Sequence, residues 1–207
     1  ARRLPNGNVL VANANQGKVF EVRPNGASGG HVVWSIDDLQ YPCDAQRLDN
    51  GNILIAEFSS ARVTEIDPRD KSRKWSAPVN NPTSAERLED GTTLVSVSQG
   101  PVVELDAKGA IRLRYSVAGS NEYRATRTSE GTTLITDQRG MQIVEMDRKN
   151  AVLWTYDQVP QPRMAIRLDD GNTMIFKRNG EIIEVDSRGQ TMRTFGRFSG
   201  AGTFSVY

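Results

Sequence analysis

The residues best suited to chemistry stand on either side of an alanine that recurs about every 40 residues along the chain. These flanking positions differ from copy to copy, and function is expected where the copies of a repeat differ. Two acids, one base, two hydroxyls and a thioether could form a polar small-molecule pocket, but they match no recognisable catalytic constellation. The candidate binding residues are Asp44, Gln46, Ser84, Glu86, Arg124, Thr126 and Met164.

The sequence predicts neither a catalytic residue nor a metal site. The one histidine, His31, is expected in an extended turn of the first copy and has no partner in sequence for a Ser-His-Asp arrangement. The one cysteine, Cys43, is interpreted as a small buried hydrophobe, with a reactive thiol as the alternative. Ca²⁺ needs several oxygen ligands, and Asp44 and Glu86 alone give it thin support. We therefore predict no cofactor, with Ca²⁺ as the alternative.

Charge and hydropathy narrow the range of partners. The 26 Lys and Arg residues balance 25 Asp and Glu residues, so no strong field attracts nucleic acid or an anionic membrane surface. No run of about 18 apolar residues is present, which argues against a transmembrane helix. A protein partner or a small-molecule ligand remains, and 207 residues suit a single domain over 1–207.

A repeat organises the whole chain. A turn glycine recurs at intervals of 44, 40, 40 and 40 residues, four positions after an arginine and just before an apolar run. Further along, every copy has a glutamate between two mostly apolar residues, as in Ile183-Glu184-Val185. The turn glycines are Gly7, Gly51, Gly91, Gly131 and Gly171.

Each copy is predicted to form four short strands. An Ala-x-Arg-Leu strand leads into an Asn-Gly or Asp-Gly pair. Such pairs are typical of hairpin turns, because these residues accept positive φ. A second apolar strand and a third strand around the glutamate follow. The fourth is centred on an aromatic or apolar residue such as Trp75, and a loop of about ten residues then returns to the next alanine.

Four-stranded units of this period predict an all-β β-propeller, because so small a sheet buries its faces only against neighbouring sheets. The five copies form either a five-bladed ring or part of a six- to eight-bladed ring, and a start inside an inner strand favours the partial ring. The repeats cover approximately residues 1–44, 45–84, 85–124, 125–164 and 165–207.

The residues that recur in every copy are interpreted as structural, since a unique active site does not need five copies. The repeated arginines and glutamates are expected to make the same ion pair or backbone hydrogen bonds in each blade. Trp34, Trp75 and Trp154 share one repeat position and are expected to pack between blades.

The stretch from Asp44 to Ala56, followed by Glu65-Ile66-Asp67-Pro68 and Trp75, resembles blades of bacterial arylsulfotransferase-type propellers and of the related PQQ-like and NHL-like repeats. The resemblance implies that the Ala-x-Arg-Leu strand is innermost, so the seven candidate residues would line the central channel. It also implies export to the periplasm or cell exterior of a bacterium. The enzymes carry a catalytic histidine in a His-Asp-Ala triplet, whereas this chain has Cys43-Asp44-Ala45.

The favoured hypothesis is therefore a non-catalytic binding or assembly module for a protein or small-molecule partner. The alternative is a propeller enzyme of the sulfotransferase, lactonase or quinone-dependent type with its site in the channel. A ligand sensor or carbohydrate-binding propeller is the third hypothesis, and exposed aromatic residues at equivalent rim positions would favour it.

Overall fold

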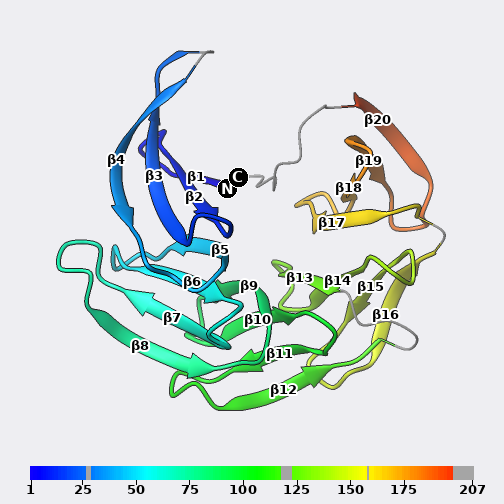
Figure 1. The fold of residues 1–207 in the computed structure, drawn as a ribbon. Helices are drawn as coiled ribbons and strands as arrows, with labels where there is room; N and C mark the ends of the chain where they lie inside the picture. Colours follow the sequence, from blue (N-terminus) through cyan, green and yellow to red (C-terminus); the bar gives the residue numbers. More distant parts are fainter. Residues whose placement is uncertain (27–28, 118–122, 158, 198–207) are drawn as a thin grey trace.

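The chain forms five antiparallel sheets of four strands each in a computed structural model, which describes residues 1–26, 29–117, 123–157 and 159–197. Figure 1 shows the sheets as the five blades of a β-propeller, arranged in an arc around a central axis. The predicted all-β propeller of four-stranded blades is confirmed. No helix long and apolar enough to cross a membrane occurs among these residues.

In every blade the strands follow one another from the axis outward (Figure 1). Blade 1 consists of β1 (Arg2–Arg3), β2 (Val9–Asn13), β3 (Lys18–Pro24) and β4 (Gly30–Ile36). Blade 2 consists of β5 (Pro42–Arg47), β6 (Ile53–Glu57), β7 (Arg62–Ile66) and β8 (Arg73–Pro78). Blade 3 consists of β9 (Pro82–Arg87), β10 (Thr93–Val97), β11 (Val102–Leu105) and β12 (Ile111–Tyr115).

The last two blades repeat this order. Blade 4 consists of β13 (Tyr123–Arg127), β14 (Thr133–Asp137), β15 (Gln142–Met146) and β16 (Val152–Tyr156). Blade 5 consists of β17 (Pro162–Arg167), β18 (Thr173–Lys177), β19 (Glu181–Val185) and β20 (Thr191–Arg197). The remainder of the predicted fifth repeat, residues 198–207, lies outside the described residues.

The repeated glycine is required by the inner hairpin turn. Gly51 has a φ of +84°, a conformation that other residues rarely adopt, and a side chain there would meet nothing within 4 Å. The turn is closed by a hydrogen bond from Gly51 N to Leu48 O of 2.9 Å. Asn50 Oδ1 also accepts a hydrogen bond from Asn52 N at 2.9 Å. Glycine is therefore selected here by backbone conformation and not by lack of space.

Two details of the sequence analysis were wrong. The loops before the inner strands are shorter than ten residues, because Pro42, Pro82 and Pro162 each begin a strand, a position where no ladder N–H is needed. His31 does not lie in a turn but within β4, paired in register with Arg23. The additional residues of the first copy thus extend the outer hairpin.

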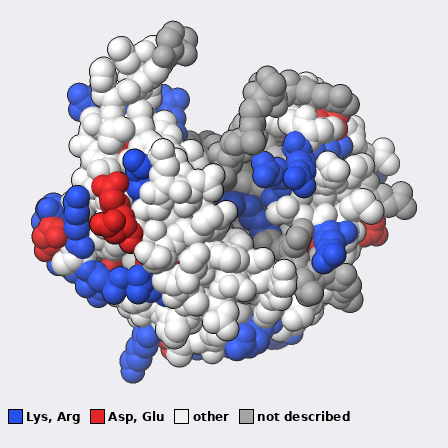
Figure 2. Space-filling model, in the orientation of Figure 1, with Lys and Arg blue, Asp and Glu red and all other residues white. Residues whose placement is uncertain are grey.

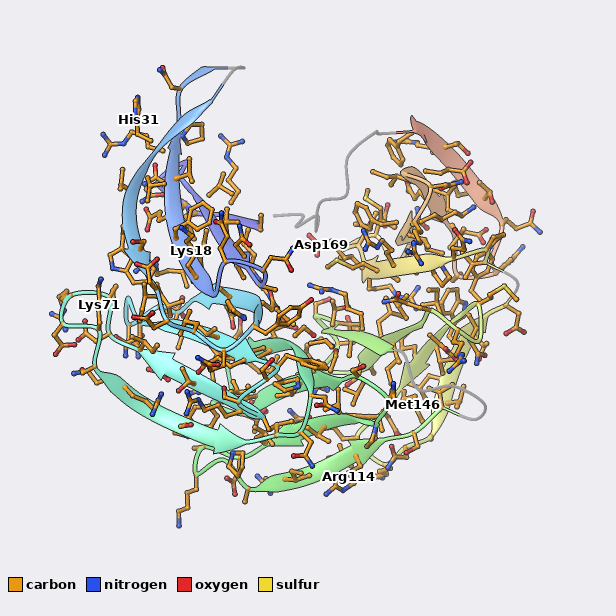
Figure 3. All side chains as sticks on the ribbon, viewed as in Figure 1. Lys18, His31, Lys71, Arg114, Met146 and Asp169 are labelled. Atoms are coloured by element: carbon orange, nitrogen blue, oxygen red, sulfur yellow. The ribbon has the colours of Figure 1, made fainter. Side chains whose placement is uncertain are left out.

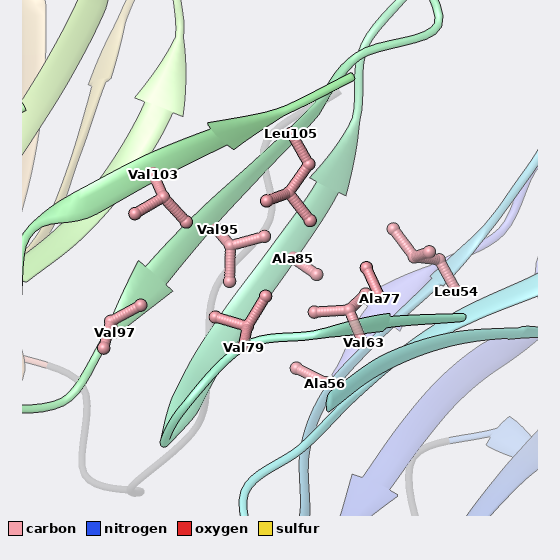
Figure 4. Close-up of a cluster of buried hydrophobic side chains, with 10 residues drawn as sticks. All are labelled: Leu54, Ala56, Val63, Ala77, Val79, Ala85, Val95, Val97, Val103 and Leu105. Atoms are coloured by element: carbon pink, nitrogen blue, oxygen red, sulfur yellow. The ribbon is translucent and has the colours of Figure 1, made fainter. Parts of the chain in front are cut away.

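The hydrophobic core lies between blades. One cluster joins Leu54, Val63 and Ala77 of blade 2 to Val95 and Leu105 of blade 3, and all five side chains are buried (Figure 4). Three further clusters join the other successive pairs of blades. Each blade is therefore stabilised mainly by its neighbours, as a repeat architecture requires.

An ion pair accompanies each of these interfaces. The glutamate of one blade's third strand meets the arginine of the next blade's inner strand, as predicted for the repeated residues. The Nη2–Oε2 distance is 2.5 Å for Arg47 and Glu21 and 3.4 Å for Arg87 and Glu65. The other two pairs are Arg127–Glu104 and Arg167–Glu145.

The tryptophans connect the blades near the outside of the propeller. The indole Nε1 of Trp34, Trp75 and Trp154 donates to a carbonyl oxygen in the outer hairpin turn of the next blade, at 2.7, 2.9 and 2.8 Å. The Arg87 guanidinium lies 4.7 Å from the centre of the Trp75 ring. The predicted packing role of the tryptophans between blades is confirmed.

Packing runs from each blade to the next in chain order. Blades 1 and 5 instead lie on opposite sides of an open part of the arc (Figure 1). Each of these end blades consequently has one face that no neighbouring blade of the described chain covers.

Candidate functional site

Side chains of an inner strand alternate between the two neighbouring blades, because successive residues of a strand point to opposite faces. On β5, Arg47 points back and pairs with Glu21 of blade 1. Gln46 points forward: its Oε1 accepts from Arg87 N at 2.7 Å, and its Nε2 donates to Arg87 O at 3.4 Å. The candidate residues occupy this forward face.

Two uncharged candidate residues bind the backbone of the next inner strand. Gln46 does so through both bonds to Arg87, and the Thr126 hydroxyl donates to Ala165 O at 3.1 Å. Ser84 is buried on β9, and Met164 is half-buried on β17. These four side chains are uncharged, so the charged groups of the channel belong to the other three candidates.

Those three candidates, Asp44, Glu86 and Arg124, interact with one another and with Arg2. We call these four residues the channel cluster. They come from the inner strands of four successive blades. Arg2 Nη2 lies 2.9 Å from Asp44 Oδ2, which also accepts a hydrogen bond from Ala85 N at 3.4 Å. The structure thus brings together side chains that are about 40 residues apart in sequence.

Burial and charge act in opposite directions on the two acids of the channel cluster. Burial alone would raise the pKa of Asp44, but the guanidiniums of Arg2 and Arg124 outweigh it and hold that pKa below its ordinary value. Burial raises the pKa of Glu86, and Arg2 opposes this only in part. Asp44 is therefore a well-compensated anion, whereas Glu86 is not.

Arg124 is the least compensated cation of the channel cluster. Burial lowers the pKa of its guanidinium, and the attraction of Asp44 opposes that effect. Its Nε atom is buried and has no hydrogen-bond partner in the described part of the chain. A buried donor without an acceptor is costly, and such groups in native proteins require an explanation. In Figure 2, Lys and Arg side chains are visible at the centre of the arc.

A cavity of about 610 Å³ opens between blades 3 and 4 and reaches the channel cluster at Glu86. The turns that follow β9 and β13 form its walls. Arg148 lies at this cavity, with Nη2 2.6 Å from Asp90 and 3.2 Å from Glu104. The cavity therefore gives a polar molecule access to Glu86.

The two reactive side chains noted in the sequence are the Cys43 thiol and the His31 imidazole. Burial, together with the negative charge of Asp44, raises the pKa of the Cys43 thiol to about 11, so the thiol is protonated near neutral pH. His31 is exposed on the outer strand β4 and lies away from the axis (Figure 3). Within the described ranges, no group of three or more His, Cys, Asp or Glu side chains is placed to hold a metal ion.

Sequence reasoning missed two residues of the site. Arg2 occupies the repeat position of Gln46, Glu86 and Thr126, so the alignment of copies could have found it. Arg148 carries no comparable signal, because the other copies have Pro68, Ala107 and Ser187 at its position.

These observations define a β-propeller of five blades with a charged channel. The repeats are similar to PQQ-like repeats: residues 3–104 match the family model described as PQQ_2, Outer membrane protein assembly factor BamB. No curated protein sequence matches the chain significantly. The PQQ-like part of the expected resemblance is thereby confirmed.

Solved structures share the fold at low sequence identity. A protein of unknown function from Bacteroides caccae superposes with a TM-score of 0.71 at 16% identity, covering 89% of this chain and 71% of that one. Virginiamycin B lyase from Staphylococcus aureus superposes with a TM-score of 0.70 at 11% identity, covering 97% of this chain and 69% of that one. The WD40 β-propeller domain of Doa1 superposes with a TM-score of 0.72 at 13% identity, covering 91% of this chain and 64% of that one. The chain thus spans about two thirds of the length of these structures.

Proposed function

We propose that this propeller is a non-catalytic binding or assembly module, and that its channel cluster holds an acidic group of a protein or small-molecule partner. The observation that carries the proposal is the buried Nε–H of Arg124, which has no acceptor among the residues that the structure describes. Arg127 of the frame also has a buried Nε–H without an acceptor, but its Nη2 pairs with Glu104, whereas no ion pair joins Arg124 to a carboxylate among the described residues.

The chemistry of the guanidinium supports an acidic ligand. A guanidinium presents a planar fork of donors that matches a carboxylate bidentately, and such charge-assisted bonds are stronger than neutral ones. An incoming carboxylate would satisfy the Nε–H of Arg124 and offset the burial that lowers its pKa. Glu86, nearby and with a raised pKa, favours a ligand that also carries a donor group.

The test is a peptide array in which each acidic peptide stands beside the same sequence with Asn and Gln in place of Asp and Glu. The native protein is expected to prefer the acidic member of some pairs, and Arg124→Gln to abolish that preference. Arg114→Gln, on the outer strand β12, is the matched control and is expected to behave like the native protein (Figure 3). No acidic preference, or a preference that survives in Arg124→Gln, would overturn the proposal.

Native mass spectrometry of the purified protein provides the complementary measurement. A retained partner or ligand that carries a carboxylate supports the binding role. A metal or quinone released on mild denaturation would instead favour the enzyme alternative, and assays for turnover would follow.

A further inference from the structure

The repeated ion pair leaves one charge unmatched at each end of the arc. Four arginines of blades 2 to 5 pair with glutamates of blades 1 to 4. Arg3 of blade 1 and Glu184 of blade 5 occupy the same repeat positions, and no such pair joins either of them within the described chain. The two ends therefore carry opposite and complementary charges.

Glu184 is the clearer of the two cases. It is 7% exposed, as buried as Glu21 at 7% and Glu65 at 6%, which both have an arginine. Its only hydrogen bond among the described residues comes from Asn172 Nδ2 at 2.8 Å. A buried carboxylate without a counter-ion is unfavourable, so a cation supplied by a partner would stabilise the Glu184 carboxylate.

Apolar side chains of the end blades are also less buried than their counterparts in the inner blades. The second strands of blades 2, 3 and 4 are buried throughout, whereas only Leu10 is buried on β2. Val9 and Val11 are half-buried, although their counterparts Ile53 and Ile55 pack fully against the preceding blade. Blade 1 thus lacks cover on the face where a preceding blade would lie.

Blade 5 lacks cover on its opposite face. Met174 is half-buried, whereas its counterpart Leu54 is fully buried against the following blade. Phe195 lies two residues beyond the register partner of Glu184, as Tyr115 does beyond that of Glu104, and is 42% exposed whereas Tyr115 is fully buried. The equivalent face of blade 4 is covered, because Trp154 contacts blade 5 there.

We infer that these two end faces are docking sites for a further blade of the same repeat type. The occupant is a four-stranded sheet whose inner strand presents an arginine to Glu184 and whose third strand presents a glutamate to Arg3. Continuity with the four existing interfaces and the complementary end charges support this occupant. The similar solved propellers also extend beyond this chain, which covers 64–71% of them. The inference does not depend on the proposed ligand of the channel.

The first experiment supplies such a blade. A copy of residues 85–124 replaces residues 205–207, which keeps the 40-residue period, and hydrogen peroxide oxidation of methionines is followed by mass spectrometry. The internal references are Met141, which is 50% exposed, and Met146, which is 3% exposed and is labelled in Figure 3. Oxidation of Met174 is expected to slow to the rate of Met146. Changing Glu184→Arg in the extended chain should restore fast oxidation, and a compensating Arg87→Glu in the added copy should slow it again.

The second experiment uses the unextended chain and remains decisive if the extended chain fails to fold. Glu21→Gln breaks the pair with Arg47 and is expected to lower the melting temperature by roughly 5 °C. Glu184→Gln retains an acceptor for Asn172 but has no ion pair to lose, so its melting temperature should not fall.

Several results would overturn the inference. One is a loss of stability in Glu184→Gln equal to that in Glu21→Gln. Another is a Met174 that the added blade does not protect. A third is a Met174 already protected in the unextended chain, either in a monomer, which would indicate closure of five blades, or in a dimer, which would indicate a second copy as the occupant.

Discussion

The inter-blade frame and the channel cluster use the same residue types in opposite ways. In the frame, arginine and glutamate recur in every blade, and each inner interface matches one with the other. In the channel cluster, Arg2, Asp44, Glu86 and Arg124 occur once each and compensate one another unevenly. Repetition therefore marks charges that pair between blades, and variation marks charges that compensate one another only in part.

The largest expected effect is the loss of a frame arginine. Arg167→Met leaves Glu145 buried without its cation and removes the guanidinium that lies 4.6 Å from the Trp154 ring centre. Breaking one partner of a buried pair should lower the free energy of unfolding by about 3 kcal/mol, measured by urea denaturation. Arg163→Met, on the same strand but exposed, is the control. Equal effects of the two substitutions would show that the ion pair with Glu145 adds no stability beyond that of an exposed arginine on the same strand.

The channel acids should respond to pH with opposite signs. The pKa of Asp44 lies below its ordinary value of 3.8, so its stabilisation is complete above that pH and disappears as pH falls. Asp44→Asn should cost about 2 kcal/mol at pH 7, and less as the pH is lowered below 3.8.

The pKa of Glu86 lies above its ordinary value of 4.5, so the folded state favours the protonated acid and stability falls as pH rises past 4.5. Glu86→Gln should therefore stabilise the protein progressively above that pH. The test is to record denaturation curves for both variants from pH 3 to pH 8, at intervals of about one pH unit. Parallel pH profiles would contradict the uneven compensation within the channel cluster.

A smaller effect is expected at the outer connection between blades. Trp75→Phe keeps an aromatic ring beside Arg87 but removes the indole N–H that donates to Ala107 O. The loss of one partly exposed hydrogen bond should lower the free energy of unfolding by about 1 kcal/mol. Blade 3 has Leu113 at this position, so the fold does not need the bond in every blade. No change in stability would show that the tryptophan acts by packing alone.

The smallest effect on stability is expected at Arg124. Because the cost of burying this guanidinium with its Nε–H unsatisfied offsets its attraction to Asp44, Arg124→Gln should change the free energy of unfolding by less than about 0.5 kcal/mol. Thermal denaturation measures this directly. A loss comparable to that of Arg167→Met would place Arg124 in the frame and remove it from the channel cluster.

Most of the fold was predictable because its determinants are local and repeated. Gly51 and its equivalents fix the inner turns, and the shared position of Trp34, Trp75 and Trp154 indicated contact between blades. The strand starts at Pro42 and Pro82 were not predictable, since proline usually argues against a strand and is accepted only at its first residue.

The candidate site was predictable in membership but not in geometry. The alignment of copies identified Asp44, Glu86 and Arg124 as variable residues of the inner strand. It did not distinguish them from Gln46 and Thr126, whose hydrogen bonds to the next strand depend on the separation of blades near the axis. That separation is a property of the assembled propeller and is not encoded in any single repeat.

The offset of the frame ion pair bears on how such a chain can change length during evolution. Each 40-residue unit contributes one arginine to the blade before it and one glutamate to the blade after it, as Arg127 and Glu145 of blade 4 do. Duplication or deletion of a whole unit therefore preserves every remaining pair and always leaves one arginine and one glutamate at the ends. Recombination between repeats would therefore change the number of blades while keeping the ion pair at every remaining interface.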